Sequence, residues 1–298
     1  MATGNIRRAK HGDLPEIYDI WYENEVAGDP NPPPRNNNLS GFRHELETGE
    51  MYVVEKEHRV VAFAALLTRS SIAYLSEFFV RPGCQSSGIG QRLLRHILPV
   101  ARYSYCTLSS SDPRAIALYI RAGMCPQWPN FLLRANGVKL DKLPVDEVEA
   151  IEGEAGDPVF VDWDAVASGR YRPVEHAYWL QEAGAVPLWF QRGDERVGYG
   201  YVQMRNAGSL WYPSAITIGP IGVRTAGEAL PCVSAAVRWA TRQADIVRIA
   251  VPGPHPALAR LLEAGFKIGY TEMFVSSAVE PFLDARRYIP AWGMLSLL

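Results

Sequence analysis

The sequence predicts an α/β protein made of two similar halves, each a mostly antiparallel mixed sheet flanked by helices. Three observations support this fold class. Strand-like and helix-like hydrophobic runs alternate along the first half. The length of 298 residues exceeds one typical domain and suggests two of about 150 residues each. Finally, the second half repeats features of the first at a nearly constant spacing, which indicates a duplicated unit.

The elements of the first half follow from hydrophobic periodicity and from the residues that punctuate it. A Pro/Asn-rich loop at 29–38 contains three consecutive prolines, which make it stiff and extended. The expected order is a strand at 6–9, a helix at 14–26, that loop, a helix at 40–48, a hairpin of 52–55 and 59–67, a strand at 73–80, a helix at 90–102, a strand at 105–109, a helix at 113–121 and a strand at 128–134.

Domain boundaries follow from composition and from the repeat. Residues 137–156 are charged and contain three glycines, so we expect a linker there, between one domain at 1–136 and a second at 157–298. Beyond the linker, 187–191 and 196–204 resemble the earlier hairpin. Matching segments are 197–199 with 61–63 at an offset of 136, Val223 with Val80 at 143, and 265–266 with 123–124 at 142.

Composition excludes several classes of function. The formal net charge is −2, and no block of basic residues indicates nucleic acid as a partner. No run of eighteen apolar residues and no apolar leader occurs, so we expect a cytoplasmic protein without membrane association. The four cysteines lack metal-ligand spacing, so we expect reduced thiols and no metal. No oligomeric state is predicted.

The stretch at 80–94 carries the strongest functional signal. A strand-like run leads into the polar loop Gln85-Ser86-Ser87-Gly88-Ile89-Gly90, and an amphipathic helix follows. Such a loop directs several backbone N–H groups one way, and the helix dipole adds positive potential, so a phosphate is its natural ligand. The loop lacks the Lys-Ser/Thr of a P-loop and the third glycine of a dinucleotide-binding fingerprint.

The larger pattern is more specific. Val-x-Pro, two further residues, Gln-x-x-Gly-x-Gly and a Leu-Leu helix together resemble motif A of the GNAT superfamily of N-acetyltransferases. Residues 112–124, Asp-Pro-Arg-Ala-Ile-Ala-Leu-Tyr-Ile-Arg-Ala-Gly-Met, are similar to the motif B helix of the same superfamily. The usual Asn is Asp112 here, which accepts but does not donate when ionised and which caps helices well. The resemblance covers residues 5–135 well and 157–295 in outline.

The resemblance implies a fold, a co-substrate and a set of site residues. The co-substrate would be acetyl-CoA, paired with a strand that ends at Val80 and splays from its neighbour. Tyr119 would protonate the leaving thiolate. Backbone amides near Phe78, Phe79 and Val80 would polarise the acetyl carbonyl. The implied cofactor-binding residues are completed by Gln85, Ser86, Ser87, Gly88, Ile89, Gly90, Gln91 and Asp112.

The general base and the acceptor are less constrained. Glu77 is the first candidate base, because strand alternation puts it and Phe79 on the face opposite Phe78 and Val80. Weaker candidates are Glu23, Glu25 and His44. The acceptor would be a primary amine of a small molecule or peptide, in contact with the loop at 29–38. Acidic neighbours favour a cationic amine, and the aromatic residues Tyr18, Trp21 and Tyr22 line a pocket or form core.

The second half has lost these features. Its loop, 225–230, holds one glycine and places Glu228 where a pyrophosphate would lie, and Leu261 replaces the tyrosine. We therefore expect a degenerate copy that is structural or contributes one wall of the acceptor pocket. A non-catalytic CoA-binding regulatory or sensor protein is the alternative function, and a longer acyl-CoA as donor stays open.

Overall fold

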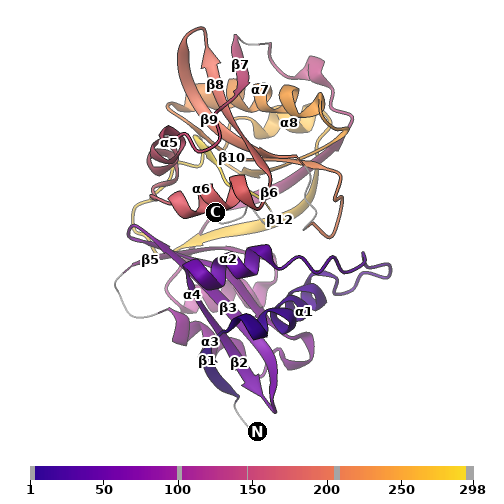
Figure 1. Ribbon diagram of the computed structural model, residues 1–298, viewed down its shortest axis with the longest axis vertical. Coiled ribbons are helices and arrows are strands. Elements are labelled where there is room, and N and C mark those ends of the chain that lie inside the picture. Colours follow the sequence, from indigo (N-terminus) through magenta and orange to yellow (C-terminus); the bar gives the residue numbers. More distant parts are fainter. Residues whose placement is uncertain (1–3, 99–102, 146, 205–208, 293–298) are drawn as a thin grey trace.

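A single mixed sheet of thirteen strands runs through both halves of the protein (Figure 1). The computed structural model describes residues 4–98, 103–145, 147–204 and 209–292. The strand order is β1-β2-β3-β4-β5-β12-β6-β11-β10-β9-β8-β7, and β13 pairs with β10 outside this path. Because helices cover the sheet, the mixed α/β fold class predicted from the sequence is confirmed.

The first half contains the predicted elements with small shifts at their ends. The helix expected at 90–102 ends at Ile97, and residues 99–102 lie outside the described ranges. The elements are β1 (Asn5–Arg8), α1 (Leu14–Glu25), α2 (Ser40–Thr48), β2 (Glu50–Lys56), β3 (Arg59–Arg69), β4 (Ile72–Val80), α3 (Ile89–Ile97), β5 (Ser104–Ser109), α4 (Pro113–Arg121) and β6 (Cys125–Asn136).

The second half repeats this order. Its elements are β7 (Val148–Glu152), α5 (Val159–Ser168), α6 (Pro173–Gln181), β8 (Ala185–Arg192), β9 (Glu195–Gln203), β10 (Ile216–Val223), α7 (Ala229–Thr241), β11 (Ile246–Pro252), α8 (Leu258–Glu263), β12 (Lys267–Ser276) and β13 (Tyr288–Ile289). The segment expected to be a linker, 137–156, contains β7, which forms an edge of the sheet beside β8. This strand has five residues, of which only Val148 is buried, so its sequence lacks the alternating pattern of a strand.

The two halves exchange their last strands. β12 pairs with β5, with Val275 opposite Thr107, whereas β6 pairs with β11, with Leu133 opposite Ile249. β6 and β12 also pair with each other in the middle of the sheet. The strand expected at 128–134 therefore joins the sheet of the second half. This exchange joins the sheets of the two repeats into one continuous sheet. Residues of both halves therefore lie on the same face of that sheet.

Helices pack on both faces of the first half. α1 and α2 bury Ile17, Ile20 and Phe42 against one face. On the other face α3 buries Leu93, Leu94 and Ile97, whose spacing forms one stripe of a helix.

A buried ion pair fixes the second half near its C-terminal segment. Arg172 Nε donates to Asp164 Oδ2 at 2.6 Å, and both side chains are fully buried. Tyr199 Oη donates to Asp164 Oδ1 at 2.5 Å, and Arg172 Nη2 donates to Tyr288 Oη at 2.6 Å. Burial alone would raise the pKa of Asp164, but Arg172 and His176 hold it below its usual range. The network joins α5, α6, β9 and β13.

Replacing Asp164 by Asn should lower the free energy of unfolding by about 3–5 kcal/mol, because it leaves the buried Arg172 charge uncompensated. Denaturant unfolding measures this loss. Asp162→Asn, on the same helix but exposed, is the matched control and should change stability by less than about 0.5 kcal/mol. Equal stability of the two variants would contradict the structural role of the pair.

Candidate active site

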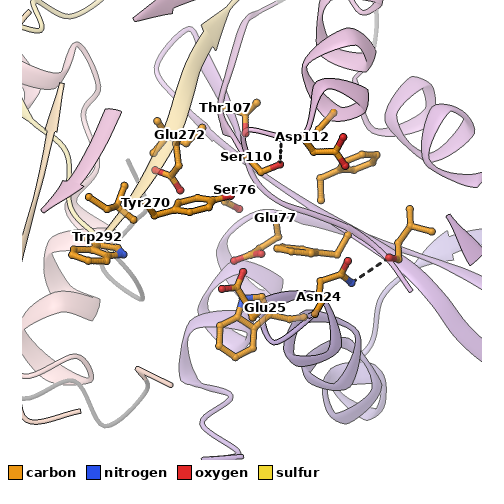
Figure 2. A pocket seen from close by; sticks show the side chains of 18 of the residues that line it. Asn24, Glu25, Ser76, Glu77, Thr107, Ser110, Asp112, Tyr270, Glu272 and Trp292 are labelled. Atoms are coloured by element: carbon orange, nitrogen blue, oxygen red, sulfur yellow. Dashed lines mark hydrogen bonds between the residues drawn. The ribbon is translucent and has the colours of Figure 1, made fainter. Parts of the chain in front are cut away.

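A cavity of about 1120 Å³ lies between the two halves. Figure 2 shows residues of the first half, such as Glu25 and Glu77, facing Tyr270, Glu272 and Trp292 of the second. As expected from the sequence, the second half contributes a wall. The predicted site residues that line the cavity are Glu77, Phe78, Phe79, Val80, Gln85, Ser86, Gly88, Gly90, Gln91, Asp112 and Tyr119. Ile89 instead packs into the core, and Ser87 is exposed.

The first half opens at this cavity because β4 leaves β5. The two strands pair in parallel from Ile72 with Ser104 to Tyr74 with Cys106, and β4 continues to Val80 without that partner. A register shift against β3 inserts Ser76 as an extra residue, and such a bulge bends a strand. Thr107 Oγ1 donates to the Leu75 carbonyl at 2.7 Å where the strands part.

The gap exposes backbone groups of β4. Arg81 N donates to Val61 O at 2.8 Å, and the register pairs Phe79 with Phe63. Because backbone groups of an antiparallel strand alternate in direction, the amide of Phe79 points to β3, and those of Phe78 and Val80 point into the gap. Asn24 Nδ2 donates to the Val80 carbonyl from the gap side at 3.2 Å. The side chains alternate too: Phe79 packs with α1 and α2, and Phe78 and Val80 with α3.

The loop at 85–90 begins α3 next to the gap. Gly88 is the N-cap, with φ of +82° and no side-chain cap on the helix amides, so a side chain there would be strained. The Gln85 side chain donates to Asn24 Oδ1 at 3.0 Å and to Val80 O at 3.3 Å. Gln85 thus ties the loop to α1 and β4. The arrangement leaves the first amides of α3 available to an anion.

Helix α4 supplies the tyrosine. Asp112 caps α4, accepting from Arg114 N at 2.8 Å, and its carboxylate also accepts from the Arg114 side chain. Tyr119 is 5% exposed and contacts the Phe78 ring edge-on at 6.1 Å between centroids. Burial raises the pKa of Tyr119, and the negative charge of Glu77 adds to this effect. The hydroxyl is therefore protonated at neutral pH.

Besides Asp112, four carboxyl groups from different elements face the cavity: Glu25, Glu45, Glu77 and Glu272. Burial raises the pKa of Glu45 to about 8 and the pKa values of Glu25 and Glu272 to about 7. Burial, with repulsion from Glu45 and Glu25, raises the pKa of Glu77 well above its usual range. Figure 2 shows the carboxyl groups of Glu25 and Glu77 close together. The group is therefore only partly ionised near neutral pH, and its remaining negative charge favours a bound cation.

Other sequence candidates have structural roles. Glu23 forms an ion pair with Arg81. His44 is buried and stacks on Tyr178 with centroids 4.5 Å apart. Of the α1 aromatic residues, Trp21 lines the cavity, whereas Tyr18 and Tyr22 hold the loop at 29–38 through Asn36 and Pro33.

The equivalent gap in the second half is filled by the chain itself. β10 pairs with β11 in parallel from Ile216 to Ile218. Beyond that, β13 pairs with β10, with Ile289 opposite Ile221 and Tyr288 opposite Gly222. These β10 residues correspond to Phe78 and Phe79 at the offset of 143. Glu228 forms an ion pair with Arg192 at 2.7 Å, and Leu261 is fully buried.

The sequence analysis did not single out several charged residues of the cavity, among them Glu45, Arg134, Arg248 and Glu272. Glu45 lies three residues after Phe42 on the buried face of α2, and Arg248 interrupts the apolar run of β11. A lone charge on a core face is a signal that could have singled out both. Arg134 and Glu272 lie on the exchanged strands β6 and β12. They reach this cavity because the two strands are exchanged, and no local sequence pattern indicates that exchange.

Comparisons with known proteins agree with this geometry. Residues 14–124 match the sequence profile of the Acetyltransferase (GNAT) family. No curated protein matches the chain by sequence. Among the described residues, no helix has the length and apolar character needed to span a bilayer.

Solved structures extend the likeness to the whole chain. A candidate acetyltransferase from Pyrococcus horikoshii superposes with a TM-score of 0.76 at 18% identity, covering 99% of this chain and 96% of that one. A tandem GNAT protein from the clavulanic acid biosynthesis pathway gives 0.63 at 16% identity, covering 93% and 99%. A GCN5-related N-acetyltransferase from Sphaerobacter thermophilus gives 0.58 at 15% identity, covering 96% and 99%.

At 15–18% identity these superpositions show a shared fold. The family profile matches the half of the chain that contains the gap beside β4 and the loop at 85–90. Residues 14–124 are thus similar in sequence to GNAT acetyltransferases, and the whole chain has the fold of a tandem GNAT protein.

Proposed function

We propose that the protein transfers an acetyl group from acetyl-CoA directly to a primary amine of a small molecule or peptide. One observation carries this proposal. The open stretch of β4, the uncapped start of α3 and the hydroxyl of Tyr119 meet at one cavity. Acyl transfer needs a place for an extended thioester, a polariser for its carbonyl and a proton for its leaving group.

The residues present fit acetyl-CoA, which would supply an activated acetyl thioester. The first amides of α3 would bind the diphosphate at the positive end of the helix. A Cβ at Gly90 would lie 3.4 Å from side-chain atoms of Phe78 and Val80, an ordinary contact distance, so the start of α3 packs closely against β4. The amides of Phe78 and Val80 would pair with the pantetheine arm as an added strand. Asp112, held by Arg114, would contribute through the backbone of its turn.

Chemistry would then proceed between Phe78 and Tyr119. A β4 amide in the gap would donate to the carbonyl oxygen as its negative charge develops. The buried, protonated Tyr119 would give its proton to the departing thiolate. Glu77 would accept the proton of the amine, directly or through a water, because it faces the cavity one residue before Phe78.

Tyr119→Phe should lower kcat about 10²–10⁴-fold and leave the Kd for acetyl-CoA unchanged, because it removes the proton donor and little binding surface. Free-thiol release with a panel of amines measures kcat, and calorimetry measures binding. Tyr52→Phe, whose hydroxyl contacts Glu50 outside the cavity, is the control. Full activity of Tyr119→Phe would reject the acid role. A wild-type protein that binds acetyl-CoA but releases no thiol with any amine would instead be a sensor.

The pH dependence of kcat/KM should reflect the carboxyl groups. The base form of Glu77 is lost as pH falls, and its pKa is raised, so activity should decline at a higher pH than an ordinary carboxyl group would give. Glu77→Gln should lose most activity at every pH. Glu45→Gln removes a neighbouring negative charge that raises the pKa of Glu77, so it should shift the activity midpoint to lower pH. Recording kcat/KM against pH with the same amine for the wild type and each variant keeps the titration of the acceptor amine constant, so a difference in midpoint comes from the protein. An unshifted midpoint in Glu45→Gln would argue against this coupling.

A further inference from the structure

Two arginines lie side by side in the cavity wall where β6 of the first half pairs with β11 of the second. Arg134 on β6 is directly opposite Arg248 on β11, so both side chains project from the same face of the sheet. Both line the cavity. The Arg248 guanidinium lies 4.8 Å from the centroid of the Trp292 ring, and Figure 2 places Trp292 at the end of the view away from Asp112. The pair is therefore distant from the loop proposed for the diphosphate.

Neither arginine has an acidic partner among the described residues. Arg248 is 5% exposed and donates to neutral acceptors: Thr217 Oγ1 at 2.7 Å, Ser209 Oγ at 2.9 Å and Trp211 O at 3.2 Å. Arg134 packs its guanidinium 3.8 Å from the centroid of Tyr212. Burial and the adjacent Arg134 lower the pKa of Arg248 to about 10, so it stays cationic at neutral pH. Two adjacent positive charges in a protein wall are costly unless an anion binds to them.

The opposite charge lies along the same sheet. Glu272 accepts from Asn130, which precedes Arg134 by four residues on β6. That separation is about 13 Å along a strand. Leu132 and Ala250 occupy the stretch between and also line the cavity. The carboxyl groups of Glu25 and Glu77 extend the acidic end toward the gap in the first half. The cavity is thus acidic at one end, apolar in the middle and basic at the other.

We propose that the acceptor is a primary amine with an anionic group at its far end, a carboxylate or phosphate, which Arg134 and Arg248 bind. The ammonium group would enter the acidic end, where Glu77 can take its proton, and an apolar segment would cross Leu132. This assignment rests on the proposed acetyl transfer and specifies its acceptor. Two guanidinium groups suit both anions, because each offers paired N–H donors.

Matched acceptors test the proposal. Linear ω-amino carboxylates of increasing length are compared with their own carboxamides, and aminoalkyl phosphates with the corresponding amino alcohols. We expect kcat/KM for the anionic member to exceed that of its neutral partner roughly 10- to 100-fold at the length that spans the cavity. The better of the two series identifies the anion as carboxylate or phosphate.

Variants connect this preference to the arginines. Arg134→Met should raise KM for the anionic acceptor about tenfold or more, with KM for acetyl-CoA and kcat/KM for the neutral partner unchanged. Arg248→Met should do the same, and Arg248→Lys should restore part of the effect. The Arg134 side chain is half-buried and makes no hydrogen bond to another described residue, so its variant tests the proposal even if Arg248→Met misfolds. Arg242→Met, exposed at the end of α7, is the control.

Binding without turnover separates the two proposals. Calorimetry with the preferred anionic amine, in the absence of acetyl-CoA, should show binding to the wild type that is lost in Arg134→Met. Thiol release that is equal for anionic and neutral amines would overturn the acceptor assignment and leave acetyl transfer standing. Absence of thiol release with every amine, combined with arginine-dependent binding of the anionic amine, would overturn acetyl transfer and leave an anion site. Absence of both would overturn the acceptor assignment as well.

Discussion

The parting of β4 from β5 is the constraint on which the rest of the site depends. A strand in the middle of a sheet has its backbone groups satisfied on both sides, and here β4 keeps one partner and frees the other side after Tyr74. The extra residue at Ser76 bends β4 away from β5, and the hydrogen bond from Thr107 Oγ1 satisfies the Leu75 carbonyl where the strands part. The separation exposes the Phe78 and Val80 amides, lets α3 begin beside them and admits Tyr119 from α4. A substitution that moves β4, α3 or α4 would therefore alter the site by changing the width of this gap.

Duplication gives the protein two such gaps with different outcomes. In the second half, β13 supplies the missing partner, and the Asp164–Arg172 ion pair with Tyr199 and Tyr288 anchors that segment. The chain then continues to Ala291 and Trp292, which line the cavity of the first half. Exchange of β6 and β12 has a similar effect, because it carries Arg134 and Glu272 to the same cavity. The second half thus fills its own gap with its tail, and together with the exchanged strand β6 it forms a charged wall of the cavity.

Much of the first half could be predicted from local signals. The spacing of Gly88 and Gly90, the stripe of α3 and the cap at Asp112 are each encoded within a few residues, and all appear in the structure. The strand exchange could not be predicted, because the pairing of β6 with β11 and of β12 with β5 joins segments far apart in the sequence and no local pattern specifies it. β13, the two-residue strand that fills the gap in the second half, is too short to give a periodic signal in the sequence. Glu45 and Arg248 could have been identified as candidates, since each is a charged residue on a buried face. That both line one cavity depends on tertiary structure. The domain division at 136 and 157 and the site roles stay predictions.

The central claim is that one open gap per chain binds acetyl-CoA while the chain itself occupies the other. Isothermal titration of purified, ligand-stripped protein with acetyl-CoA tests it most directly. An Arg287→Ala variant is compared, because the Arg287 side chain donates to the Val223 carbonyl and so holds β13 against β10. The account predicts one molecule bound per wild-type chain, with binding lost when the start of α3 is blocked by Gly88→Glu. Binding of two molecules per wild-type chain, or none at millimolar concentration, would contradict it.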